Sequence, residues 1–236
     1  MRCSSREFAA LVHRDVQRPG AREAVSWLIG REPSGPPGLP YRLDERWTDV
    51  VAALAGGSVF GFADIGGAEP CRVLVSVARN AAARVQVRDE SVTADVVRPD
   101  APWPALTGAL PEAERAEGSE VTVPTAILAD ARACEEIARE LRRQDVPVDD
   151  ARDLEALLAR ADGFAARIEV ALCEGDGPLR RVPSAIEVHN SPTGRVAVIP
   201  EAPDDTYTMV APADAFVIGR ALQHYLDTLW DSSAAS

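Results

Sequence analysis

Residues 164–172 read FAARIEVAL, and this stretch alternates apolar and polar side chains over most of its length. Side chains that alternate in this way point to opposite faces of a β-strand. Arg167 and Glu169 fall on one face, and the other face is expected to carry Phe164, Ala166, Ile168, Val170 and Leu172. The stretch therefore predicts a long strand with one face in the core and one polar face.

The residues on either side of this strand predict helices and a meander of strands. Upstream, Asp149 or Asp150 is expected to cap a helix that stops at Gly163. Downstream, the expected elements are a strand at residues 185–189, a turn at 191–194, strands at 195–199 and 207–210, and a helix from Pro212 to Trp230.

Residues 44–110 predict the same order of elements earlier in the chain. The expected elements there are a helix capped by Asp44, strands at residues 59–63, 72–77, 84–88 and 91–97, and a short helix at 103–110. Gly57 stands before the first strand as Gly163 does in the second half, and Pro102 precedes the closing helix as Pro212 does. We interpret this order as a duplication with pseudo-repeats at residues 44–111 and 150–230. Hairpin-linked strands then predict an α+β fold, in which one mostly antiparallel central sheet is flanked by helical bundles.

The segments outside the pseudo-repeats are expected to be helical. Residues 1–43 form an N-terminal helical and loop segment, and residues 44–236 form a single domain in which residues 112–149 are connecting helices. One helix is expected from Pro124 to Arg143, because apolar residues recur along one stripe of it. That stripe includes Ile127, Leu128, Ala131, Cys134 and Ile137.

Composition excludes several classes of function. The chain has 236 residues, of which 46% are hydrophobic and 26% are charged, so it can build a core. Its net charge of −12 repels phosphate backbones and anionic lipid, which argues against nucleic-acid and membrane-surface binding. The longest uncharged stretch, residues 50–63, is shorter than the roughly 20 residues that a membrane helix needs. With no secretory signal visible either, a cytoplasmic location is expected.

No motif in the chain predicts catalysis, a cofactor or a metal ion. The four cysteines and three histidines are widely spaced, whereas zinc ligands come in close pairs. The chain contains no phosphate-binding glycine loop and no GxSxG elbow. A triad of Ser184, His189 and an aspartate stays open, because such partners can be distant in sequence. We expect no catalytic, cofactor-binding or metal-binding residues.

Four short segments and their order resemble a known family. They are VTVPTAIL at residues 121–128, the strand at 164–172, NSPTGR at 190–195 and TMVAPADA at 208–215. These segments are similar to the short strand and helix entry, the long strand, the TPxGR turn and the APADA helix start of the EspG family. This family comprises chaperones for ESX, or type VII, secretion in actinobacteria. The resemblance covers about residues 44–230, and the chain departs from the family in its short amino-terminal segment.

The resemblance implies a quasi-symmetric fold without catalytic residues that binds a PPE-like protein within a PE–PPE-type heterodimer. Such a chaperone covers the helical tip of the PPE protein, keeps it soluble and targets it for export. Family contacts come from the loop between the second and third strands, the central sheet and the carboxy-terminal helical bundle. The corresponding candidates here are Arg79, Asn80 and Ala81 in the loop at residues 78–83, and Ile127, Leu128 and Ala131 on the bundle. For the last three, the apolar stripe also predicts ordinary core packing.

Two other functions stay open. A hydrolase would require His189 or His224 beside a nucleophile. A structural or regulatory homodimer of the same fold would have its partner groove filled by its own side chains or by a second copy. The chaperone instead requires an apolar groove at the junction of sheet and bundle, and it can be a monomer or a homodimer.

Overall fold

The structure is a computed structural model that describes residues 1–33, 45–159, 163–191, 194–202 and 204–234. The expected cap Asp44 and the expected turn residues Pro192 and Thr193 lie outside the described residues. Among these described residues, no helix is long and apolar enough to cross a membrane.

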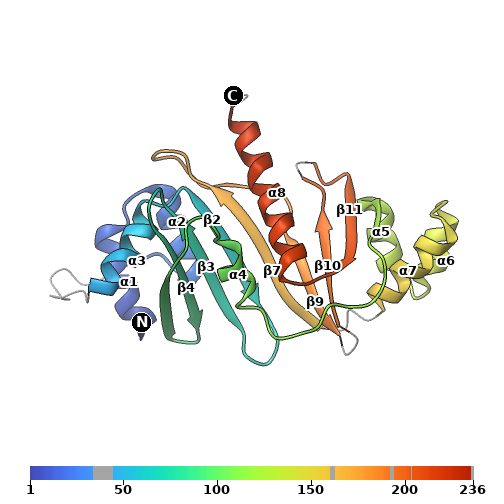
Figure 1. Cartoon of the computed structure of the whole chain (residues 1–236), viewed down its shortest axis with the longest axis horizontal. Coiled ribbons are helices and arrows are strands. Elements are labelled where there is room, and N and C mark those ends of the chain that lie inside the picture. The colour runs from blue at the N-terminus through green and yellow to red at the C-terminus, as the bar shows by residue number, and fades with distance from the viewer. Residues whose placement is uncertain (34–44, 160–162, 192–193, 203, 235–236) are drawn as a thin grey trace.

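The described chain folds into one large antiparallel sheet with helices on both faces (Figure 1). The strands are β1 (Arg2–Ser4), β2 (Val59–Ile65), β3 (Cys71–Val77), β4 (Ala82–Arg88), β5 (Ser91–Val97), β6 (Val121–Pro124), β7 (Gly163–Leu172), β8 (Arg180–Arg181), β9 (Ile186–Ser191), β10 (Gly194–Pro200) and β11 (Tyr207–Pro212). The helices are α1 (Ser5–Asp15), α2 (Pro19–Ile29), α3 (Glu45–Ala55), α4 (Trp103–Thr107), α5 (Thr125–Arg132), α6 (Ile137–Arg143), α7 (Val148–Leu158) and α8 (Ala215–Ala234). The α+β class predicted from the sequence is confirmed.

The order of the strands is nearly symmetric about the middle of the sheet. It runs β1-β5-β4-β3-β2-β7-β9-β10-β11-β6, and β8 pairs with β7 beside this path. Each half begins with a short strand, β1 or β6, that pairs with the last strand of its own meander, β5 or β11. In each half three helices separate that strand from the meander, and a closing helix follows the meander. This order favours the interpretation of a duplicated unit, and it adds a leading strand and two helices to each half.

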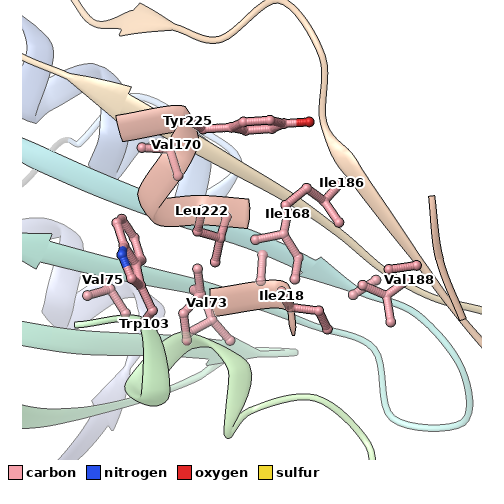
Figure 2. Close-up of a cluster of buried hydrophobic side chains, with 14 of the residues drawn as sticks. Val73, Val75, Trp103, Ile168, Val170, Ile186, Val188, Ile218, Leu222 and Tyr225 are labelled. Atoms are coloured by element: carbon pink, nitrogen blue, oxygen red, sulfur yellow. The ribbon is translucent and has the colours of Figure 1, made fainter. Parts of the chain in front are cut away.

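The two faces of the sheet are covered differently. On one face, α4 and α8 cover the core cluster that is drawn in part in Figure 2. On the other face, α1, α2 and α3 cover the outer strands of the first half, and α5, α6 and α7 cover those of the second half. The three clusters are built largely from alternate residues of the strands, as expected when a sheet buries both faces.

Helix α8 is held by a row of apolar side chains. Ile218, Leu222 and Tyr225 are each at most 1% exposed and face the central strands (Figure 2). The strand residues in the same cluster include Val73, Val75, Ile168, Val170, Ile186 and Val188. Full burial of a large apolar side chain contributes about 1.5–3 kcal/mol. This cluster therefore fixes α8 across the middle of the sheet.

The helix expected from Pro124 to Arg143 is instead two helices. Helix α5 ends at Arg132 and α6 begins at Ile137, and Cys134 between them is exposed. The break allows α6 to turn back against α5 and α7, so that Ala138 and Leu141 reach the core. The expectation of one continuous stripe was wrong because α6 packs against both α5 and α7, which requires the chain to turn back after α5.

Two expected helix starts also lie elsewhere. Pro212 is the last residue of β11, and Asp214 caps α8 by accepting hydrogen bonds from the backbone N–H groups of Phe216 and Val217, each at 2.9 Å. In α7, Asp149 and Asp150 lie in the first turn and Pro147 is at the cap. Acidic side chains in a first turn still favour the helix through its dipole.

Arg195 on β10 ties the connection between the halves to the sheet. This residue is 5% exposed, its Nε donates to Asn190 Oδ1 at 3.0 Å, and its Nη2 donates to the carbonyl of Pro111. Its backbone also bonds to Glu114 and Ala116 of the same connection. Burial lowers the pKa of the Arg195 guanidinium, which is the expected effect of placing a cation away from water.

We predict that Arg195→Ala lowers the free energy of unfolding by about 1–3 kcal/mol, because two partly buried oxygens lose their donor. The midpoint of urea unfolding measures this loss. The matched control is Arg98→Ala, since the Arg98 side chain is 78% exposed and pairs with Asp100 at the surface. The control should change the free energy by less than about 0.5 kcal/mol. Equal midpoints for the two variants would show that the Arg195 contacts do not hold the connection.

Candidate functional site

A strip of the central sheet lies open between two helical bundles. The first bundle consists of α1, α2 and α3, and the second consists of α5, α6 and α7. Helices α1, α2 and α3 contact β1, β3, β4 and β5, whereas α5 and α7 contact β6 and β11. The strands β2, β7 and β9 run between the bundles (Figure 1). We call this surface the central strip, and its residues are Asp64, Phe164, Arg167, Glu169, Glu187 and His189.

Charges of opposite sign alternate across the central strip. Arg72 on β3 pairs in register with Asp64 on β2, and Asp64 pairs with Arg167 on β7. Arg167 in turn pairs in register with Glu187 on β9. Directly opposed residues on neighbouring strands have their Cβ atoms about 4.5–5.5 Å apart, so residues of opposite charge are neighbours along the row. The guanidinium groups themselves bind elsewhere: Arg72 donates to the carbonyl of Trp27 at 3.0 Å, and Arg167 donates to Glu169 at 3.1 Å. The row therefore offers both donors and acceptors on one face of the sheet.

A second group of charges joins the strip to the first bundle. Arg181 on β8 binds Glu169 at 2.9 Å and Glu23 on α2 at 3.5 Å. The same guanidinium lies 4.4 Å from the ring centroid of Phe62, which Trp27 of α2 contacts edge-on at 4.9 Å. Arginine on an aromatic face is a favourable and geometrically defined contact. These contacts fix the border of the strip on the side of α2.

Arg132 of α5 joins the strip to the second bundle. Its Nη1 donates to Glu187 Oε2 at 3.2 Å, and His189 Nε2 lies 3.5 Å from the same oxygen. The His189 ring and then the Arg132 guanidinium hold the pKa of Glu187 at about 2, against the opposing effect of partial burial. Glu187 is thus charged at any physiological pH.

Phe164 faces the central strip and not the core, contrary to the prediction. A β-bulge between Phe164 and Ala166 shifts the pairing with β9, so Ala165 and Ala166 are both buried on the α8 side. One extra residue in a strand reverses the facing of everything before it. Phe164 is therefore 48% exposed, and its ring contacts that of His189 edge-on at 6.4 Å between centroids.

His189 is the buried polar group of the strip. It is 8% exposed, and within the described residues neither of its ring nitrogens makes a hydrogen bond. The 3.5 Å separation from Glu187 is too long for a strong hydrogen bond. A buried polar side chain without a hydrogen bond costs free energy unless a partner satisfies it.

The expected apolar groove is not found on the central strip. Its side chains are charged or polar apart from Phe164, because the helices of the two bundles contact mainly the outer strands and this part of the sheet meets water. An apolar groove does occur on the other face of the sheet, between α8 and the strands β10, β11 and β6. It has a volume of about 410 Å³.

The structure places the predicted contact residues in two separate regions. Arg79 and Asn80 are exposed in the turn between β3 and β4, and Ala81 beside them is half-buried. Ile127 on α5 is half-buried, whereas Leu128 and Ala131 are 3% and 0% exposed in the core of the second bundle. The turn belongs to the first half of the sheet and α5 to the second, so these residues do not form one patch.

The residues considered for a hydrolase are also apart. The hydroxyl of Ser184 donates to the carboxylate of Asp205 just before β9 begins, whereas His189 lies further along β9 beside Phe164. His224 lies on α8, on the opposite face of the sheet from His189. In the chain as described, no group of three or more His, Cys, Asp and Glu side chains could hold a metal ion. Ser184, His189 and His224 therefore do not form the cluster that a hydrolase would require.

Comparison with known proteins agrees with this fold. A search of the curated proteins gives no match. The structure of the Mycobacterium tuberculosis type VII secretion system chaperone EspG5 in complex with the PE25–PPE41 dimer is similar, with a TM-score of 0.70. The alignment covers 97% of this chain and 96% of that chain at 16% sequence identity, so the likeness concerns the fold. The sequence profile of the EspG family matches residues 40–224, which is most of the chain. The chain therefore belongs to the EspG family.

Proposed function

We propose that this protein is a type VII secretion chaperone that binds a PE–PPE-type heterodimer at the helical tip of its PPE-like subunit. It keeps that subunit soluble in the cytosol and delivers it for export, without catalysing a reaction. The observation that carries this proposal is the match to the EspG family over residues 40–224. The similar fold of EspG5, whose structure is that of a complex with PE25–PPE41, supports it.

The central strip is the surface that we assign to the partner. Where two helices meet at a tip, one helix ends in unpaired carbonyl groups and the next begins with unpaired N–H groups. Arg132 and Arg167 can donate to such carbonyls, while Asp64 and Glu187 can accept from such N–H groups. The alternating row thus matches the two kinds of backbone group that a helical tip presents.

Phe164 and His189 supply the anchor of this proposed interface. Phe164 is the one large apolar side chain among the strip residues that is substantially exposed, and it lies amid charged groups. Interfaces concentrate their binding energy in an aromatic residue surrounded by polar contacts that exclude water. His189 beside it has two ring nitrogens without a hydrogen bond in the described part of the chain, which a partner could satisfy.

The exposed turn between β3 and β4 is proposed as a second contact. Arg79 and Asn80 can reach a partner that extends over the first half of the sheet, with Ala81 packed beneath them. On the second bundle, Ile127 is half-buried and can contribute to the surface, whereas Leu128 and Ala131 support α5 from the core.

Co-expression tests the proposed function directly. A PPE-like protein encoded beside this chain, produced with its PE-like subunit, should become soluble only when this chain is present. Affinity purification of the tagged chain should then recover all three proteins at equal molar ratio. If the PPE-like protein is equally insoluble with and without the chain, the chaperone proposal is wrong.

We predict that Phe164→Ser weakens capture of that heterodimer by about 1–3 kcal/mol, because an aromatic anchor is lost. Isothermal titration calorimetry of the purified components measures the change. Val96→Ser is the matched control, since Val96 is also exposed, at 53%, but lies on β5 outside the strip. An equal loss for both variants would remove Phe164 from the interface.

We predict that Arg79→Glu weakens capture while the melting temperature changes little, because the Arg79 side chain is exposed in a turn. Circular dichroism gives the melting temperature, and the same titration gives the affinity. Arg98→Glu serves as a control with an exposed arginine elsewhere. A large drop in melting temperature for Arg79→Glu would show that the residue is structural.

A further inference from the structure

The outer surface of α8 carries two large exposed aromatic residues. Phe216 near the start of the helix is 70% exposed, and Trp230 near its end is 44% exposed. Arg220, Gln223 and Asp227 lie between them at helical spacing, so all five side chains fall on one narrow stripe. An isolated exposed aromatic residue is common, but two at the ends of one stripe suggest an interface.

The stripe is held in a fixed orientation. Gln223 Nε2 donates to Asp227 Oδ1 at 2.8 Å, and the indole Nε1 of Trp103 on α4 donates to Gln223 Oε1 at 3.0 Å. The Arg220 guanidinium lies 5.9 Å from the centroid of the Phe216 ring. Groups that are already ordered lose less conformational entropy when they bind.

An apolar groove runs beside this stripe. Its apolar lining includes Ile199, Met209, Val217, Ala221 and Tyr225, its rim carries the polar residues Glu120, Thr122, Glu201, Arg220 and His224, and its volume is about 410 Å³. The corresponding outer strands of the first half, β4 and β5, carry polar side chains on this face. Among them are Arg84 and Asp95, which form an ion pair at 2.6 Å. The second half thus has a groove with apolar walls and a charged rim where the first half carries an ion pair.

The stripe is complementary to itself when it is reversed. If two copies of α8 cross antiparallel near Gln223, Phe216 of one helix lies opposite Trp230 of the other. Arg220 then lies opposite Asp227 in the same arrangement, which occurs twice because the pair is symmetric. One twofold axis relates the two aromatic contacts to each other and the two ion pairs to each other. A surface that binds an unrelated partner is not expected to be complementary to a second, antiparallel copy of itself.

We propose that the α8 face is a dimerisation surface and that its partner is a second copy of this chain. An exposed aromatic residue of one copy would then reach the apolar groove beside α8 of the other. This surface lies on the opposite face of the sheet from the central strip, so a dimer leaves both strips free. The proposal therefore goes beyond the proposed chaperone function and does not depend on it.

Sedimentation equilibrium of the purified full chain over a wide concentration range tests the proposal. The wild type should dimerise, and Phe216→Ser should weaken the dimer about tenfold or more, because it removes both of the aromatic contacts between the copies. The control Phe164→Ser, an exposed phenylalanine of the other face, should leave the dimer unchanged. A wild type that stays monomeric, or a dimer that is equally stable in Phe216→Ser, would overturn the proposal.

Charge reversal tests the antiparallel arrangement itself. Arg220→Asp and Asp227→Arg should each weaken the dimer about tenfold, because each places like charges opposite one another twice. The double variant should regain most of the wild-type affinity, since the ion pairs form again with reversed sign. Failure of the double variant to recover, with unchanged melting curves, would exclude this pairing of the helices. Capture of the PPE-like heterodimer should be unaffected in all of these variants.

Discussion

The pairing of β2 with β7 joins the two halves of the molecule, and the rest of the structure depends on it. Every residue of β2 from Val59 to Ile65 has a partner on β7, from Leu172 to Ala166. Because side chains alternate, this register sends Ile168 and Val170 toward α8 and sends Arg167 and Glu169 toward the opposite face. A shift by one residue would place charges in the core and apolar side chains in water. The core beneath α8 and the charged central strip are therefore two consequences of one register.

Departures from the matching order of elements distinguish the two halves. The closing helix of the first half, α4, is five residues long, whereas α8 has twenty. The connection between β7 and β9 contains β8 and folds onto α2, where Arg18 donates to the carbonyls of Gly57 and Gly175. The strand β7 has a bulge where it pairs with β9. Its counterpart in the first half, β2, pairs with both of its neighbours without a register shift. These departures create the exposed Phe164, the α8 stripe and the border of the strip.

The charged character of the central strip has a physical explanation. Exposed ion pairs contribute only about 0–1 kcal/mol each, so the charged row adds little to folding through its ion pairs, which are Arg167–Glu169 and Arg132–Glu187. It does keep the open centre of a large sheet from presenting apolar strands to other chains, which is a common route to aggregation. The same pairs have already oriented their side chains. A binding partner can therefore replace hydrogen bonds to water with protein–protein hydrogen bonds without first ordering flexible groups.

Local pattern determined most of the elements of this protein. The alternation in residues 84–88 and 164–172, the glycines at 57 and 163, and the apolar positions of α8 depend only on neighbours in sequence. They were sufficient to predict the meanders, the closing helices and the α+β class. The family resemblance also rested on short contiguous segments. What could not be predicted in this way are contacts between residues distant in the chain. The alternating row requires Asp64, Arg167 and Glu187 to be in register, and register is set by strand pairing. Phe164 faces the strip because the pairing of β7 with β9 contains a bulge. The break between α5 and α6 lies within a run of apolar residues at helical spacing, so the pattern alone did not reveal it. The sequence by itself thus determined which segments are strands and helices, since propensity and periodicity are local. Only the tertiary structure decided which side chains meet between the bundles, because that depends on how separate segments pack.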